Sequence, residues 1–402
     1  MPDKNQSLLP SKYRSRLVIL LLAFTVAFLA IGFSIGASDL SSQHSFQLSS
    51  PLAGLIVIHP VLMVFGVIGG LLIAEKIELM KNFEVLRGLS MSFLIVPLTI
   101  SGIIIYSTGL LLPSLLVTYA GAFLIALVGF LFMWFMISSR SHGTRDAKII
   151  MGSSLLALSL SAIAESYLNA LNSSTVALLL LSFPIIYVLG ERIELGQMRG
   201  IKRRSVLFLE SSTVAVPFML FIATLVGESN TSWLLFNLSL ILLILMGAVT
   251  ALHDPSIRIS KLGGTLQSFM RFGIRSSYVW LFLGLILYAV QHDIAKGFMD
   301  PATHSIAIGF LGTFIISHSP IIFPLILKIR ANTERVTRLP LYALNAAAAL
   351  RVGGDLVSRF FGFGNILVFS SIWVLLLAIL LFLGNIARIR VPFKENAKAV
   401  QE

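Results

Sequence analysis

Residues 52–74 read LAGLIVIHPVLMVFGVIGGLLIA, a run of 23 residues with no charged side chain and one histidine. Because an α-helix rises about 1.5 Å per residue, about 20 such residues are enough to cross the hydrocarbon core of a bilayer. The run therefore predicts a transmembrane helix. It also places His59 inside that helix, where an ionisable side chain is costly and is a candidate for a functional site.

Apolar runs of this length recur along the rest of the chain. They predict an all-α polytopic membrane protein with twelve transmembrane helices, in one integral membrane domain that covers residues 1–402. The predicted tails are residues 1–16 and 387–402, and the helices lie within 17–386. The twelve spans are predicted at residues 17–37, 52–74, 89–110, 112–137, 148–169, 174–190, 205–227, 232–252, 276–293, 301–327, 339–359 and 365–386.

The composition agrees with this class and excludes several others. The chain is 56% hydrophobic and 12% charged, whereas soluble domains contain about 25% charged residues. Little material is left for a large extramembrane catalytic domain. The absence of cysteine excludes disulfides, iron–sulfur clusters and covalently attached c-type haem. Any redox cofactor is therefore expected to be held noncovalently, most simply by histidine.

Lysine and arginine residues indicate the orientation of the helices, because they are retained on the cytoplasmic side of short loops. With the N-terminus inside, the inside segments hold 27 of them, the outside loops hold two (Lys296 and Arg359), and one, Arg351, lies within a span. The sequence thus predicts a multi-pass protein of the cell (plasma) membrane with both termini cytoplasmic. This distribution and contact with anionic membrane lipid explain the net charge of +12, so no nucleic-acid partner is expected.

A short internal repeat suggests how the helices are grouped. Residues 75–79 read EKIEL at the end of the second span, and residues 191–195 read ERIEL at the end of the sixth. The tenth span also ends in basic residues, Lys328 and Arg330. This spacing suggests a pseudo-threefold arrangement of four-helix units. The alternative is that the segments are independent helix ends of similar polarity.

Few ionisable residues fall inside the predicted spans, and each is a candidate for function. These residues are His59, Glu165, Glu210, His304, His318, Arg351 and Asp355. Glu165 and Glu210 lie at outer and inner depths, where isolated carboxylates suit a proton path, although snorkelling to the membrane surface explains Glu165 equally well.

His59 and His304 lie in spans that run in the same direction, and both belong to the outer leaflet. Each is followed six residues later by phenylalanine, Phe65 and Phe310, with glycines nearby. Glycines below a histidine on its own helix let a flat macrocycle approach the backbone. The pattern therefore indicates noncovalent haem ligation. The alternative is that each histidine bonds to a neighbouring helix and the glycines serve helix packing.

His318 follows His304 by fourteen residues, which places both on one side of a helix about 21 Å apart. That distance is too large for one iron, but it is the spacing by which helices of cytochrome b type hold two stacked haems. His318 is thus a candidate ligand of a second, inner haem, for which His253 is the nearest partner. The alternative is a His-Ser-Pro turn that satisfies its own backbone.

Arg351 and Asp355 are four residues apart on the eleventh span, so they can pair on one helix face. Arg351 is expected near the depth of His59, where a guanidinium can neutralise a haem propionate. A plain buried ion pair is the alternative interpretation.

At these residues the sequence resembles the NnrS family, twelve-span membrane proteins that contain haem and copper and are associated with nitric oxide stress. That family is in turn reminiscent of the catalytic subunit of haem–copper oxidases. In the second span the family pattern is similar to His-x-His-Glu-Met-x-Phe-Gly, which this chain matches at His59, Met63, Phe65 and Gly66. In the tenth span a pattern with a histidine and two glycines is similar to His304, Gly309, Gly312 and Thr313.

The resemblance implies a haem b in the outer half of the bundle, bound by His59 with His304 or His318 and with Arg351 at a propionate. It implies electron transfer or the handling of a small gas such as nitric oxide, with a gas or a redox protein as partner. Copper, which the family contains, lacks its ligands in the second span, where Val61 and Leu62 replace a histidine and a glutamate.

Two other functions fit twelve helices. A secondary transporter without a cofactor would contain discontinuous helices near the midplane. The prolines at 97, 184, 217, 320 and 324 are the candidate positions for such helix breaks. A scaffolding subunit of a larger membrane complex would need only the short loops and apolar helices.

Overall fold

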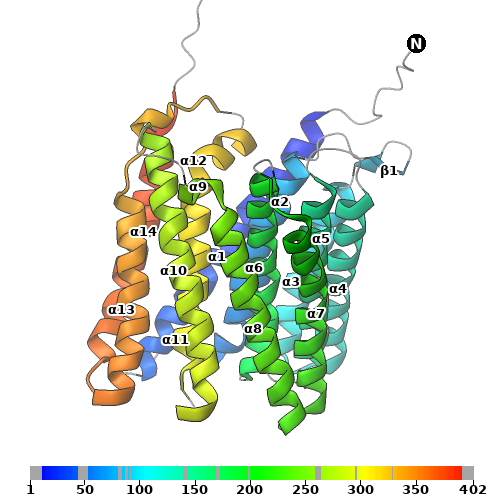
Figure 1. Ribbon diagram of the computed structural model, residues 1–402, viewed down its shortest axis with the longest axis vertical. Coiled ribbons are helices and arrows are strands. Elements are labelled where there is room, and N and C mark those ends of the chain that lie inside the picture. Colours follow the sequence, from blue (N-terminus) through cyan, green and yellow to red (C-terminus); the bar gives the residue numbers. More distant parts are fainter. Residues whose placement is uncertain are drawn as a thin grey trace, which may run out of the picture.

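The computed structural model describes residues 11–43, 53–79, 84–86, 89–90, 92–138, 144–168, 173–197, 200–258, 264–294, 297–327 and 329–391. These residues form an upright bundle in which successive long helices run in opposite directions (Figure 1). The helices are α1 (Ser11–Gln43), α2 (Gly70–Leu79), α3 (Ser92–Leu111), α4 (Leu115–Ser138), α5 (Arg145–Leu168), α6 (Ser174–Gln197), α7 (Arg203–Val226), α8 (Asn230–His253), α9 (Pro255–Arg258), α10 (Thr265–Ile294), α11 (Met299–His304), α12 (Thr313–Leu327), α13 (Leu339–Phe361) and α14 (Asn365–Ile389).

Two spans contain further helical segments. The second span is a 3₁₀ segment η1 (Ala53–Ile58), a π-helix η2 (Val61–Gly69) and α2, whereas the tenth is α11, a π-helix η3 (Ser305–Gly312) and α12. A 3₁₀ turn η4 (Thr333–Arg335) precedes α13. A small antiparallel hairpin of β1 (Glu84–Leu86) and β2 (Leu89–Ser90) lies between α2 and α3.

The predicted helical class is confirmed, with this one hairpin as an addition. Every predicted span contains a helix, and eleven helices of the described chain are long and apolar enough to cross a membrane. The helix α13 is not among the eleven, because polar residues such as Asn345, Arg351 and Asp355 lower its hydropathy. Helix α1 begins at Ser11 and α14 ends at Ile389, so both helices extend into the predicted tails.

The predicted proline breaks are not where the helices change their geometry. Pro97, Pro184 and Pro217 lie inside the continuous helices α3, α6 and α7, and Pro320 and Pro324 lie inside α12. The irregular segments are instead the two π-helices. π-Helical turns are rare in proteins overall, and those that occur are often found at functional sites. The two π-helices therefore mark parts of the second and tenth spans as candidates for function.

Helix α6 is the core of the bundle. In its spanning window 89% of the residues are buried, compared with 17% in α14, which lies at the edge beside α13 (Figure 1). Buried aromatic residues such as Phe183 and Tyr187 fill the space around α6. Any polar side chain on α6 must therefore find its partners inside the protein.

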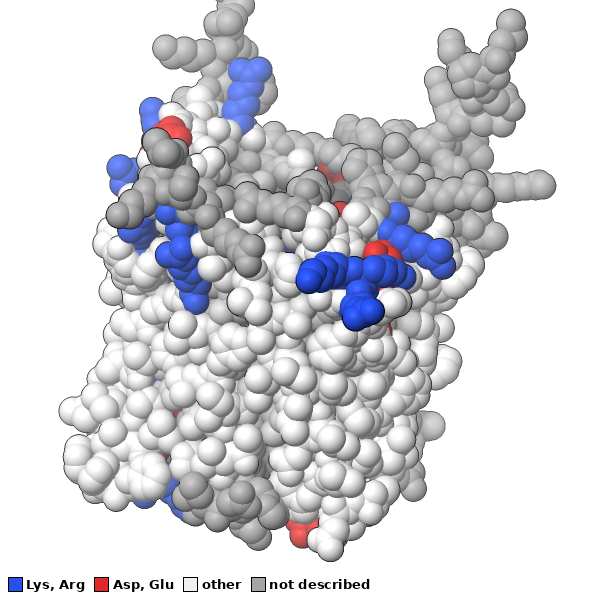
Figure 2. All heavy atoms as spheres, viewed as in Figure 1, with Lys and Arg blue, Asp and Glu red and all other residues white. Residues whose placement is uncertain are grey.

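The basic residues are distributed unevenly between the two ends of the bundle. Figure 2 shows that Lys and Arg of this face gather toward the end at which the chain begins, with few at the opposite end. We call these the basic end and the opposite end. The apolar band between them is largely free of charge on this face.

Close packing of α3 against α4 predicts that Gly121→Ala destabilises the fold. A Cβ atom at Gly121 would collide with the backbone of Tyr106, and overpacking of this kind costs about 1–3 kcal/mol. The matched control is Gly384→Ala on α14, where an added Cβ atom has no neighbour within 4 Å. We expect a lower Tm for the first variant only, measured on purified protein in detergent; equal Tm values would contradict the packing.

Candidate functional site: two buried polar clusters

The structure brings together three of the four site residues predicted from the sequence. The titratable and charged groups that act on the His59 imidazole are His304, Arg351 and Asp300. We call these four residues, together with Asp355, the histidine cluster. It lies toward the opposite end, near α11 (Figure 1).

His59 is held in place by α1. Its Nδ1 lies 2.8 Å from the carbonyl oxygen of Gly32, so Nδ1–H donates to that carbonyl. The ring lies against Gly36, where an added Cβ atom would be 3.0 Å from the His59 Cε1. The glycine at 36 therefore leaves the space in which the imidazole is positioned. The π-helix η2 begins two residues after His59.

His304 is held from its own helix. Its Nδ1 lies 2.9 Å from Oδ1 of Asp300 and 3.0 Å from the Asp300 carbonyl oxygen. Arg351 donates to the other carboxylate oxygen of Asp300. The π-helix η3 begins directly after His304. His304 thus stands immediately before a π-helix and His59 two residues before one, and both use Nδ1 for a bond to the protein.

Arg351 is buried between two carboxylates. Its Nε lies 3.2 Å from Oδ2 of Asp355, which is the ion pair expected from their spacing on α13. Asp300, half exposed, supplies the second carboxylate. The Nη1 atom of Arg351 is buried and has no hydrogen-bond partner among the described residues. A buried guanidinium nitrogen of this kind can receive an anionic group.

The glycines near the two histidines have a different role from the one predicted. A Cβ atom at Gly66 would lie 2.8 Å from the Phe28 ring, and one at Gly309 would collide with the ring of Trp280. Side chains of neighbouring helices therefore fill the space directly beside these two glycines. These glycines serve close helix packing, which is the alternative that the sequence left open.

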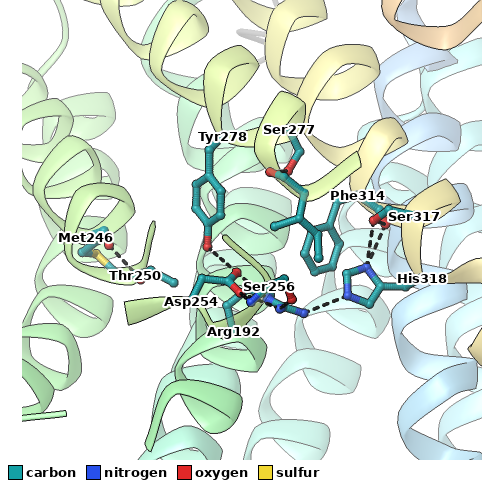
Figure 3. Close-up of polar contacts among 11 residues, drawn as sticks. Arg192, Met246, Thr250, Asp254, Ser256, Ser277, Tyr278, Phe314, Ser317 and His318 are labelled. Carbon is teal, nitrogen blue, oxygen red and sulfur yellow. Dashed lines mark hydrogen bonds and ion pairs between the residues drawn. The ribbon is translucent and has the colours of Figure 1, made fainter. Parts of the chain in front are cut away.

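A second group, the arginine cluster, lies around the buried Arg192 (Figure 3), beside α9 at the basic end (Figure 1). Arg192 forms a bidentate ion pair with Asp254, with both N–O distances at 2.7 Å. Its Nη2 also donates to the hydroxyl of Ser256 at 2.6 Å. The hydroxyl of Tyr278 donates to Asp254 at 3.2 Å. The cluster therefore ties α6 to the α8–α9 turn and to α10.

His318 belongs to the arginine cluster and is separate from the histidine cluster. Arg192 Nη1 donates to His318 Nε2 at 2.8 Å, and His318 Nδ1 lies 3.0 Å from the carbonyl oxygen of Phe314 (Figure 3). The His318 ring also packs on the Phe314 ring, with centroids 4.2 Å apart. Because both ring nitrogens have protein partners, neither is presented to a metal here.

Sequence reasoning missed Arg192, Asp254 and Asp300. Arg192 stands at the expected end of the sixth span, yet its side chain is 2% exposed, and that of Asp254 is 0% exposed. The signal for Arg192 was its place in the repeat at residues 191–195. Asp300 had no signal, because it stands at the expected start of a span.

The remaining candidates do not join either cluster. Glu210 lies 3.7 Å from the exposed Arg203 in an ion pair. The side chain of Glu165 lies outside the described residues. Among the described residues, no three or more His, Cys, Asp or Glu side chains are arranged to hold a metal ion. The arrangement therefore offers two imidazoles and a guanidinium, with no protein-only metal cage in the part of the chain that the structure describes.

The arginine cluster predicts a large loss of stability for Arg192→Met. The variant leaves the buried carboxylate of Asp254 without its counter-charge, which costs about 3–5 kcal/mol. Arg203→Met is the matched control, because Arg203 pairs with Asp146 at 2.9 Å while 60% of its side chain is exposed, and such pairs contribute about 0–1 kcal/mol. Thermal unfolding in detergent measures both. A control that loses as much stability as Arg192→Met would be inconsistent with the buried pair.

Comparison with known proteins places the chain in a family without assigning it an activity. Residues 16–388 match the family model described as a domain of unknown function, DUF8744. No curated protein matches the chain. The family match covers nearly the whole helical bundle, and the protein therefore belongs to the DUF8744 family.

Proposed function

We propose that this protein is a haem-binding integral membrane protein similar to the NnrS family, in which His59 and His304 would hold the haem. It would serve electron transfer or the handling of a small gas such as nitric oxide. The observation that carries the proposal is that His59 and His304 both use Nδ1 within the protein. Among the described residues, no hydrogen bond to the Nε2 of either ring is present.

This use of the ring nitrogens is what ligand histidines require. A metal-bound imidazole generally donates its other N–H to a backbone carbonyl or a carboxylate, which fixes the tautomer and the ring orientation. His59 has the carbonyl of Gly32 as this partner, and His304 has the carboxylate of Asp300. Arg351 in turn holds Asp300 in place. The donors therefore fit a metal at Nε2.

The number of donors favours haem over a bare metal ion. Protein-only zinc sites use three or four side-chain ligands, and the described residues offer no such group. Haem supplies four nitrogen ligands of its own and needs one or two from the protein. A pair of imidazoles, His59 and His304, therefore matches haem in number. Copper is not part of the proposal.

Arg351 supports the same assignment. A haem carries two propionates, and a buried guanidinium is a suitable partner for one of them because its charge is permanent. The free Nη1 of Arg351 is the donor that we assign to this contact. Asp300 and Asp355 keep the guanidinium oriented from its other nitrogens.

When bound, haem would supply an iron that exchanges an electron or binds a diatomic gas. The residues of this chain decide between these uses. A haem held by both His59 and His304 would favour electron transfer, whereas a haem held by one of them would favour gas binding.

We further propose that the basic end faces the cytoplasm, so that both termini are cytoplasmic and the histidine cluster lies in the outer half of a cell membrane. The crowding of Lys and Arg at that end supports this orientation (Figure 2). When α13 is counted as a span beside the eleven apolar helices, its charged residues Arg351 and Asp355 face partners inside the bundle. The grouping into three four-helix units stays a prediction.

The visible spectrum of purified, detergent-solubilised protein tests the haem proposal. We expect a Soret band in protein reconstituted with haem, and we expect His59→Ala and His304→Ala to weaken or shift it, because each removes an Nε2 ligand. The matched control is His253→Ala, whose Nδ1 bonds to the carbonyl of Val249 on its own helix. That variant should keep the wild-type spectrum. Carbon monoxide added to the reduced protein distinguishes an open site from bis-histidine ligation.

A reconstituted protein without a Soret shift would refute the haem proposal. The secondary transporter would then be the favoured function, with Arg351 as its anion-binding group. Loss of anion uptake in Arg351→Ala vesicles, with no cofactor present, is the result that such a transporter predicts.

A further inference from the structure

Four neighbouring spans enclose an apolar cavity on the side of the bundle where α3, α4 and α5 lie (Figure 1). The second span supplies Phe65 and Gly69 from the π-helix η2 and Ile73 from α2, and α3, α4 and α5 supply the other walls. All the residues that line the cavity are buried, and Phe65 is only 2% exposed. The cavity is therefore an internal space of the protein that adjoins one of the two π-helices.

The walls of the cavity do not favour a water molecule. Among the described residues that line it, Thr99 is the one with a polar side chain. The Thr99 hydroxyl already donates to the carbonyl oxygen of Ile95 at 2.7 Å. A buried water molecule needs about two to four polar partners. Water inside the cavity would therefore lose hydrogen bonds, and the space favours an apolar occupant.

The side chains around the cavity resist its collapse. The lining side chains that branch at Cβ include Ile73, Ile103, Ile125 and Val128. Such side chains have one strongly preferred rotamer in a helix. Gly69 adds no side chain to the wall. The residues best placed to fill the space thus have few rotamers with which to fill it, and a gap remains in an otherwise closely packed core.

The size of the cavity limits the class of its occupant. It leaves about 10 Å³ for the centre of a water-sized molecule, which is room for about one such molecule. A lipid chain, a quinone or a haem is too large for this space. Dry apolar cavities bind small apolar guests such as xenon, which are held by dispersion contacts with the wall. Size and polarity together favour a diatomic gas.

The cavity lies where such a gas can reach it. Ile103 on α3 lines the cavity, whereas the next residue, Ile104, is 43% exposed on the outer surface of the bundle. One layer of helix therefore separates the cavity from the surrounding lipid, in which small apolar gases dissolve more readily than in water. On the second span, Phe65 follows His59 by six residues, which is no more than about 9 Å along the helix axis.

We propose that this cavity is a binding site for one molecule of a small apolar gas, the class that includes nitric oxide, carbon monoxide and O₂. The gas enters from the lipid side and is held by dispersion contacts with the aliphatic side chains and the Phe65 ring. The site keeps the gas close to the helix that carries His59. Binding in the cavity needs no cofactor, whereas use of the gas at the histidine cluster rests on the proposed function.

Crystals of the purified full-length protein under xenon pressure test this site, because xenon is small and apolar and scatters X-rays anomalously. We expect an anomalous peak in the cavity, against Phe65 and Leu158, in protein without haem. Val128→Ile adds one methylene to the wall and should remove the peak, whereas Ile103→Val takes one away and should strengthen it. The matched control is Val279→Ile, at a position that is 66% exposed on α10, and it should keep the wild-type peak.

Absence of a xenon peak from the cavity of the wild-type protein would overturn the gas site. A peak that Val128→Ile and Val279→Ile leave equally strong would overturn it too. Neither result depends on a Soret band, so this test is distinct from that of the haem proposal. A Soret band without xenon in the cavity would remove the gas site alone, and xenon in the cavity without a Soret band would remove the haem alone.

Discussion

A charge buried among apolar helices has to be neutralised within the bundle, and this constraint organises the protein. Arg192 lies on α6, the helix with the most extensive burial, and finds its counter-charge in Asp254 at 2.7 Å. Tyr278 and His318 complete the hydrogen bonds of this pair. Four elements are therefore fixed around one guanidinium: α6, the α8–α9 turn, α10 and α12. Leaving either charge alone would cost several kcal/mol, so these elements have to come together for the bundle to form.

The same constraint explains why polar residues lie at both ends of two particular spans. The second span carries His59 near the opposite end and Glu75 near the basic end, and the tenth carries His304 and His318 in the same order. A π-helix separates the two positions in each span. Each span thus links the histidine cluster to a polar group at the basic end.

Sequence analysis predicted the helices well because their cause is local. A run of about 20 apolar residues has few alternatives to a helix in a membrane, and each expected span contains one. Residues 339–359 form a helix as expected, although its polar residues keep it out of the eleven helices that are apolar enough to cross a membrane. The meeting of His59, His304 and Arg351 was also foreseen, from their expected depths.

What could not be foreseen depends on contacts between distant segments, such as Arg192 with Asp254, because no pattern in one sequence specifies which helices are neighbours. The role of the glycines was misjudged for the same reason, since Phe28 and Trp280 come from other helices.

The central claim is that the imidazoles of His59 and His304 present Nε2 to one bound group. A density map of the protein purified from its native membrane, at a resolution that shows side chains, tests this most directly. The account predicts additional density for a bound group at the Nε2 atoms of His59 and His304 and at Nη1 of Arg351. Rings whose Nε2 atoms bond only to protein or water, with no further density between them, would contradict it.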